Sequence, residues 1–201
     1  MNKETAKRAE EIFKQYCGMM ATKEVIAAGI HPRTLYAMRD EGLLERVSRG
    51  RYRLSSMPGL SNPDLVTVAT RIPRGVVCLI SALAFHRLTD EIPHQVYVAL
   101  SPGTEKPRIE YPPVRIVWFS DEAFMKGIEK HDIDGVEVHI YGPAKTVADC
   151  FKFRKKLGLD VALEALKAYR NQPGFNLEEL MRYAKIRKVE KVMRPYLEAL
   201  I

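Results

Sequence analysis

The segment ATKEVIAAGIHPRTLYAMRDEGLLERVSRGRYRL, residues 21–54, carries the densest local structural signals in the chain. Thr22 is the expected N-cap of a first helix, because its hydroxyl can accept a hydrogen bond from a free amide in the first turn. Gly29 ends that helix, since glycine readily adopts the left-handed conformation found at helix C-termini. Pro32 opens a second helix, whose first turn needs no amide donor, and Gly42 closes it. The segment therefore predicts two short helices joined by a tight turn.

The second of these helices has an apolar side and a polar side. Leu35 and Met38 are three residues apart and are expected to face the interior. The other side chains of the helix are expected on its outer faces, and they include Arg33, Thr34, Tyr36 and Arg39. Val25 and Ile26 are expected to give the first helix its apolar side.

A basic hairpin is expected directly after the two helices. Val47, Tyr52 and Leu54 can line one side of two short strands, and Gly50 lies at the turn between Arg49 and Arg51. Two helices, a tight turn and a basic wing make a winged helix-turn-helix, whose second helix enters the major groove of DNA. The alternative is a helical hairpin with a solvated arginine-rich loop. The ordered succession of signals favours DNA binding.

The charge distribution supports an anionic partner. The chain has 201 residues and a formal net charge of +7, which favours such a partner only weakly. Six arginines are concentrated in the segment described above: Arg33, Arg39, Arg46, Arg49, Arg51 and Arg53. A second basic run lies near the C-terminus and comprises Arg182, Lys185, Arg187, Lys188, Lys191 and Arg194. We interpret that second run as the solvated face of two helices.

The cysteines and the apolar segments indicate a reducing compartment. Cys17, Cys78 and Cys150 are far apart and odd in number, which argues against both a disulfide framework and a zinc site. The N-terminal residues have no apolar signal core, and no apolar run approaches membrane-spanning length. A cytoplasmic protein without a membrane partner is therefore expected.

The chain is expected to consist of two domains, residues 1–56 and residues 63–201. The boundary is the stretch SSMPGLSNP, which combines small residues with two prolines and a glycine. A helix over residues 4–16 completes the first domain. The second domain is expected to be α+β, a small mixed sheet followed by a C-terminal helical subdomain. Its expected strands are 76–80, 95–100, 114–119 and 135–141. Its expected helices are 64–72, 81–88, 120–128, 143–157, 160–169, 177–184 and 188–200.

Several polar residues suggest catalysis, but each has a structural explanation. His86, Asp90 and His94 are spaced by four, as metal ligands on a helix would be, yet Pro93 interrupts such a helix. Ser81 could form a triad with His86 and Asp149, but no glycine-flanked nucleophile elbow surrounds it, and a helix-capping serine explains it better.

One acidic motif also suggests a nuclease. Asp134 with Glu137 faintly resembles the acidic motif of restriction-type nucleases, but the lysine expected two places after the glutamate is missing. Neither a phosphate-binding glycine loop nor a dinucleotide fingerprint is present. We therefore expect a non-enzymatic protein with no cofactor and no metal site.

The chain resembles the AbiEi antitoxins of type IV, or AbiE, toxin–antitoxin systems. The resemblance rests on TKEVIAAGIHPRTLYAMRDEGLLERVSRGRYRL, on SALAFHRLTDEIPHQVYVAL, and most strongly on YGPAKTVADCFKFRKKLGLDVALEALKAY. The linked order of the wing, the SALAFH helix and the PAKTVADCFKFRKKLG helix is more specific than any of these elements alone.

The resemblance implies two activities and a role in phage defence. Such antitoxins repress their own operon by binding inverted repeats in promoter DNA through the winged domain. They also counteract a partner toxin of the nucleotidyltransferase superfamily without forming a stable complex, and this activity needs the C-terminal domain. The alternatives are a solitary regulator whose second domain senses a ligand or dimerises, and a nucleic-acid-processing enzyme with a degenerate catalytic domain.

Two sets of side chains are the expected binding residues. For DNA they are Arg33, Thr34, Tyr36 and Arg39 on the second helix, with Arg49 and Arg51 at the wing. For antitoxicity we expect a basic surface on the helix over 143–157, formed by Lys145, Lys152, Arg154 and Lys155. These four cations lie beside Asp149. The simpler explanation for that second set is solvation and helix-dipole complementarity.

Overall fold

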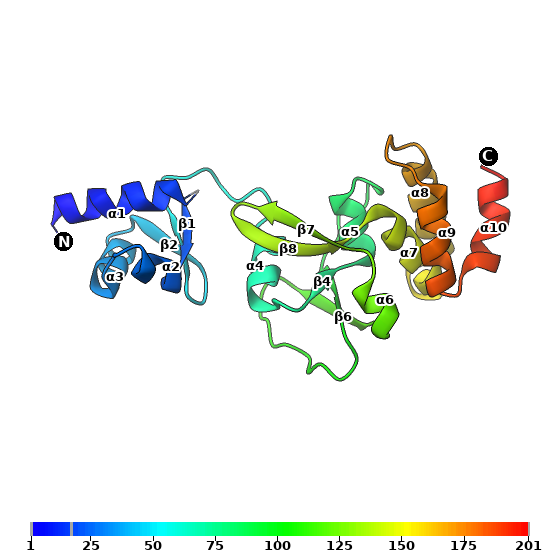
Figure 1. The fold of residues 1–201 in the computed structure, drawn as a ribbon, viewed down its shortest axis with the longest axis horizontal. Helices are drawn as coiled ribbons and strands as arrows, with labels where there is room; N and C mark the ends of the chain where they lie inside the picture. The colour runs from blue at the N-terminus through cyan, green and yellow to red at the C-terminus, as the bar shows by residue number, and fades with distance from the viewer. Residues whose placement is uncertain (1, 17, 201) are drawn as a thin grey trace. The chain divides into compact units, whose positions relative to one another are not determined.

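The computed structural model describes residues 2–16 and 18–200, which form two compact units (Figure 1). The first unit comprises the chain up to Pro73 together with Asp132–Glu137, and the second comprises Arg74–His131 and the chain from Val138 onward. This division groups residues 63–73 with the N-terminal part. Whether residues 1–56 and 63–201 fold as separate domains stays a prediction.

The first unit is a winged helix. Its elements in chain order are α1 (Lys3–Gln15), β1 (Met19–Ala21), α2 (Thr22–Ala27), α3 (Pro32–Asp40), β2 (Leu44–Ser48), β3 (Arg51–Leu54) and α4 (Pro63–Arg71). The sheet has the order β1-β3-β2, and both pairs are antiparallel. Tyr52 of the central strand pairs with Met20 on one side and Arg46 on the other. The apolar core beneath the sheet includes Phe13, Met20, Val25, Leu35, Met38 and Leu54.

The two helices begin and end near the expected residues, but one cap differs. Pro32 is the first residue of α3, as predicted. Thr22 is not the N-cap of α2; Ala21 holds that position, and its amide donates to Glu24 Oε2 at 2.6 Å. The Thr22 hydroxyl instead donates to the carbonyl of Gly50 at 3.1 Å. Ile26 is 51% exposed and therefore does not contribute to the core.

The second unit contains a mixed sheet, helices that pack around it, and a C-terminal helical group. Its sheet has the order β6-β5-β4-β8-β7. Its strands are β4 (Val76–Val77), β5 (Val96–Leu100), β6 (Val114–Trp118), β7 (Ile128–Ile133) and β8 (Val136–Tyr141). The end of β7 and the start of β8 belong to the segment Asp132–Glu137 that is grouped with the first unit. β5 pairs with β6 in parallel and β4 with β8 in parallel, while β4 and β5 are antiparallel.

The helices of this unit complete the α+β class that the sequence predicts. They are α5 (Leu79–Phe85), α6 (Asp121–Met125), α7 (Pro143–Leu157), α8 (Leu159–Arg170), α9 (Leu177–Ile186) and α10 (Glu190–Glu198). α7 contacts α5, α8 and α9, and its residues 144–151 are all buried. None of the helices in the described ranges combines the length and the apolar character needed to cross a membrane.

The apolar run at residues 76–80 is shorter as a strand than expected. Only Val76 and Val77 are in β4, because Leu79 has a positive φ of 49° and already begins α5. The proposed capping role of Ser81 is also wrong, since Ser81 lies inside α5. Its hydroxyl accepts from the amide of Tyr97 at 2.9 Å and lies 3.3 Å from the carbonyl of Gln95, so it fastens α5 to the start of β5.

Candidate nucleic-acid interface

α3 is anchored by its apolar side and presents its polar side outward. Leu35 and Met38 have no exposed surface, as the spacing predicts. On the other side, Arg33 is exposed, Tyr36 is 43% exposed, and Thr34 is half-buried. The helix therefore offers a rigid row of polar side chains, which is the arrangement that a major-groove reading helix needs.

The start of α3 is fixed by an unusual cap. The His31 ring accepts a hydrogen bond at Nδ1 from the amide of Arg33, with a distance of 3.1 Å. A side-chain acceptor at this position satisfies one of the free amides at the helix N-terminus. The backbone that carries Arg33 is thereby held in place.

Arg39 is held against its neighbours on the last turn of α3. Its guanidinium donates from Nε and from a terminal nitrogen to Asp40 Oδ1, at 2.8 and 2.6 Å, and lies 5.3 Å from the centre of the Tyr36 ring. The hydrogen bond to Asp40 raises the pKa of Arg39. Because the pair is exposed, a phosphate or a base edge can compete for the guanidinium at little cost.

The wing contains two different kinds of arginine. Arg49 is exposed and Arg51 is half-buried, on either side of Gly50, whose φ of 73° makes the turn. Arg53 is only 8% exposed and forms an ion pair with Glu45 on the adjacent strand β2. Of the arginines in the hairpin, Arg53 therefore belongs to the interior of the unit, while Arg49 and Arg51 remain available at the wing.

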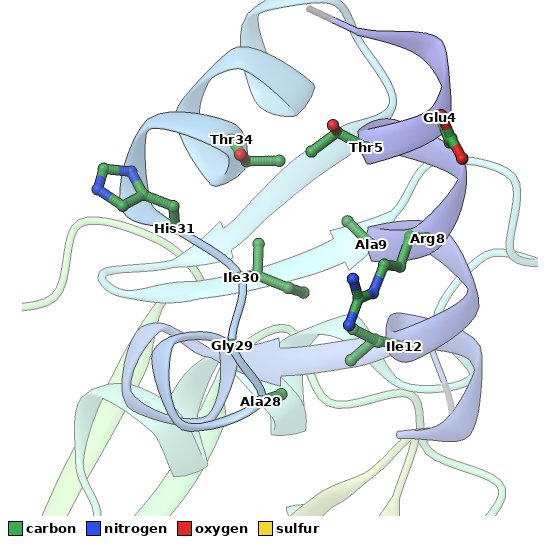
Figure 2. Close-up of a pocket in the computed structure, with 10 residues that line it drawn as sticks. All are labelled: Glu4, Thr5, Arg8, Ala9, Ile12, Ala28, Gly29, Ile30, His31 and Thr34. Atoms are coloured by element: carbon green, nitrogen blue, oxygen red, sulfur yellow. The ribbon is translucent and has the colours of Figure 1, made fainter.

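A cavity of about 340 Å³ lies beside the first turn of α3 (Figure 2). α1 contributes Arg8 to its lining, and the α2–α3 turn and α3 contribute His31 and Thr34. In helix-turn-helix proteins an adjacent helix commonly touches the DNA backbone next to the reading helix. Arg8 is thus a candidate phosphate contact that sequence reasoning missed. In the sequence it is an ordinary solvated position of an amphipathic helix, so only its place in the lining of this cavity identifies it.

The four cations expected on α7 do not form one surface. Lys152 and Lys155 are exposed, and Arg154 is half-buried with its guanidinium donating to the carbonyl of Phe151 at 2.8 Å. Lys145 has no exposed surface at all. Of the four expected cations, only Lys152, Lys155 and part of Arg154 are therefore exposed, and Lys156 in the last turn of the helix is exposed as well.

Lys145 belongs instead to a buried charged cluster. Its ammonium lies 2.5 Å from Asp149 Oδ2, and Nε of Arg187 lies 2.6 Å from Asp149 Oδ1. Burial lowers the pKa of Lys145 and raises that of Asp149, since desolvation disfavours both charged forms. Arg187 is only 6% exposed, so it is not part of a solvated basic run.

Aromatic rings surround the two cations of this cluster. The Lys145 ammonium lies 4.1 Å from the centre of the Tyr141 ring, and the Arg187 guanidinium lies 4.4 Å from that of Phe119. Asp149 carries one negative charge against two cations, and the negative faces of the rings attract the positive charge that remains. The cluster is a structural element of the second unit rather than a binding surface.

The residues that suggested catalysis are engaged elsewhere. Asp149 binds Lys145 and Arg187, the Ser81 hydroxyl binds the backbone of β5, and His86 Nε2 lies 2.8 Å from the carbonyl of Tyr141. Ser81, His86 and Asp149 therefore form no triad. α5 ends at Phe85, so His86, Asp90 and His94 do not share a helix.

The acidic motif likewise has a structural role. Asp134 has a φ of 53° in the turn before Gly135, and its carboxylate accepts from the amide and the hydroxyl of Ser61, at 2.8 and 3.0 Å. This is the ordinary turn into a strand that the Asp-Gly sequence indicates.

Comparison with known proteins gives a family match over part of the chain and solved structures with a similar fold. Residues 8–55 match the family model described as transcriptional regulator, AbiEi antitoxin. The crystal structure of the RV2827C protein from Mycobacterium tuberculosis superposes with a TM-score of 0.57 and 14% identity, over 97% of this chain and 81% of that one. At that identity the likeness concerns the fold alone. No curated protein matches the chain.

Proposed function

We propose that the chain is a transcriptional regulator of the AbiEi antitoxin type, which the family match over residues 8–55 supports, and that it represses its own operon by binding inverted repeats in double-stranded promoter DNA. The observation that carries this proposal is the row of polar side chains on α3. Arg33 and Tyr36 face outward there, while Leu35 and Met38 hold the helix rigidly against the core.

In this proposal α3 reads the bases and the wing holds the backbone. Arg33 lies in the first turn of α3, the part of a recognition helix that reaches base edges, and arginine can bind guanine with two parallel hydrogen bonds. Thr34, Tyr36 and Arg39 extend the contact along the helix. Arg49 and Arg51 contact phosphates or enter the adjacent minor groove, where they add affinity independent of sequence.

Gel-shift titration on the native promoter and on a scrambled duplex of equal length tests the reading role of α3. We expect Arg33→Ala to weaken promoter binding by about fivefold to 150-fold, which corresponds to about 1–3 kcal/mol for one bidentate base contact. Its affinity for the scrambled duplex should change much less. Arg170→Ala removes an exposed arginine from α8 and is the matched control. Equal affinity of the unmodified protein for both duplexes would refute base reading.

We also propose that the chain is the antitoxin of a nucleotidyltransferase-type toxin and that it acts without catalysis. The family description supports the antitoxin role. The structural engagement of Ser81, His86 and Asp149 is consistent with binding rather than catalysis. Two exposed cations of α7, Lys152 and Lys155, are the proposed contact for an anionic partner such as a nucleic acid substrate of the toxin.

Co-expression with the product of the adjacent gene tests the second activity. Growth should be restored by the full chain and lost when Lys152 and Lys155 are both replaced by glutamate. The matched control replaces Lys167, an exposed lysine of α8, by glutamate. If the Lys152→Glu, Lys155→Glu variant still restores growth, these α7 cations do not contact the partner. An adjacent product that is harmless alone would favour the solitary regulator.

A further inference from the structure

Two histidines and one glutamate converge in the second unit. His86 follows the last residue of α5, and Glu129 and His131 lie on β7. One potential ligand atom from each residue lies within 4.8 Å of the other two. Because all three belong to residues 74–131, the cluster lies within one compact unit.

The geometry of His86 leaves one ring nitrogen free to bind a metal ion. Nε2 lies 2.8 Å from the carbonyl oxygen of Tyr141, which can only accept, so Nε2 carries the proton. The lone pair is then on Nδ1. Metal-binding histidines commonly donate their other nitrogen to a backbone carbonyl in this way, which fixes the ring and its tautomer.

The two ligands from β7 are already close to the required separation. Glu129 and His131 are two residues apart in a strand and therefore point to the same side. Glu129 Oε2 and His131 Nε2 lie 3.1 Å apart. Two ligands of one tetrahedral zinc ion lie about 3.3 Å apart, given metal–ligand bonds of about 2.0–2.1 Å. A metal ion would thus take the place of the proton between these two atoms.

The surroundings position these side chains without covering them. The Phe85 ring stands edge-on to both histidine rings, with centroids 5.2 Å from His86 and 4.8 Å from His131. Gly142 lies against the Glu129 carboxylate, and a side chain at that position would collide with it. Side chains of Glu129 and His131 are 45% and 29% exposed, which gives an ion access from solvent.

We propose that His86, Glu129 and His131 bind one divalent transition-metal ion of the zinc class. Two imidazoles and a carboxylate suit zinc, whereas magnesium and calcium prefer oxygen ligands. Three protein ligands leave one coordination position open to water. The bound ion ties the end of α5 to β7 and stabilises the second unit by mass action. The site is separate from the DNA interface and does not depend on the proposed function.

Calorimetric titration of the chelator-treated full chain with zinc chloride tests the site, together with thermal unfolding at each zinc concentration. We expect one zinc ion per chain and a rise in Tm that saturates at the same stoichiometry. His131→Ala and Glu129→Gln should each weaken zinc binding at least tenfold, and magnesium chloride should neither bind nor raise the Tm.

His94→Ala is the matched control, because His94 is an exposed histidine outside the cluster. It should keep both the stoichiometry and the affinity of the unmodified chain. Both β7 variants change partly exposed side chains, so they should fold, and their zinc-free Tm values verify this. Absence of zinc binding, or binding that His131→Ala and Glu129→Gln leave unchanged, would overturn the proposal.

Discussion

The ammonium of Lys145 and the carboxylate of Asp149 lie 2.5 Å apart, one helical turn from each other in α7, and neither side chain has any exposed surface. Removing two charges from water costs several kcal/mol per ion, and only close pairing offsets it. Arg187 supplies a second cation at 2.6 Å from the same carboxylate. The one anion therefore balances two buried cations, and its loss should have the largest effect.

Replacing Asp149 by asparagine should destabilise the protein by about 3–5 kcal/mol, because it leaves two buried cations without their counterion. Lys145→Met should cost clearly less, since Asp149 keeps Arg187 as its partner and the methionine fills the apolar space. Urea unfolding monitored by circular dichroism measures both. Lys152→Met changes an exposed lysine of the same helix and is the control. A larger loss of unfolding free energy for Lys145→Met than for Asp149→Asn would contradict this charge balance.

Arg49→Ala and Arg51→Ala should weaken binding to promoter and scrambled DNA by similar factors. Each variant should also flatten the plot of log affinity against log salt by about one unit of slope, because one phosphate contact fewer releases one counterion fewer. Gel shifts over a range of potassium chloride concentrations give this slope. An unchanged slope would mean that the wing arginines do not touch phosphates.

Arg53→Met should affect folding rather than DNA recognition, since Arg53 is buried against Glu45 in the central strand of the wing sheet. We expect a loss of about 1–2 kcal/mol, less than for Asp149, because Glu45 is half-exposed and solvent screens the pair. Thermal unfolding measures the loss. The Arg53→Met protein that remains folded should bind DNA with the same slope of log affinity against log salt as the unmodified protein, whereas Arg51→Ala should flatten that slope.

His31→Ala removes the N-cap of α3 and should cost about 1 kcal/mol, whereas His31→Asn preserves a side-chain acceptor and should cost little. DNA affinity should follow the same order, because the cap fixes the turn that carries Arg33. Unfolding curves and gel shifts on the two variants provide the comparison. Equal behaviour of the alanine and asparagine variants would show that the cap is dispensable.

Cys78 and Cys150 should resist alkylation by iodoacetamide in the native protein. Both thiols are fully buried, and burial raises their pKa values above the usual range, so the reactive thiolate is scarce at pH 8. Peptide mass spectrometry should detect their labelling only when urea unfolds the second unit. Modification of either thiol within minutes under native conditions would disagree with this packing.

The elements with clear ends were predictable from the sequence. α7 spans Pro143–Leu157 as expected, because proline starts it and Gly158 ends it. α3 was equally well defined by Pro32 and by Gly42, whose φ of 76° lies in the left-handed region. In both cases local chemistry determines the boundary, so no tertiary information is needed.

Elements that depend on distant partners were missed. β1 has only three residues and exists because Met19–Ala21 pairs with β3. β7, with the sequence IEKHDI, contains four charged or titratable residues and lacks the apolar alternation typical of a strand. The cluster of His86, Glu129 and His131 was missed for the same reason, since only the folded sheet brings β7 to the end of α5. Burial of Lys145 was missed because a lysine in an amphipathic helix ordinarily faces water.

The inward orientation of Lys145 and Asp149 also determines what a randomised library of α7 can select. Substitutions over residues 144–151 change the interior of the second unit. Cells that survive expression of the adjacent gene product with such a library would therefore be enriched for variants that accumulate in folded form. Substitutions at Lys152 and Lys155 leave that interior intact, and survivors there would be enriched for partner recognition. Two separate libraries on one helix would therefore distinguish loss of abundance from loss of the proposed antitoxic activity.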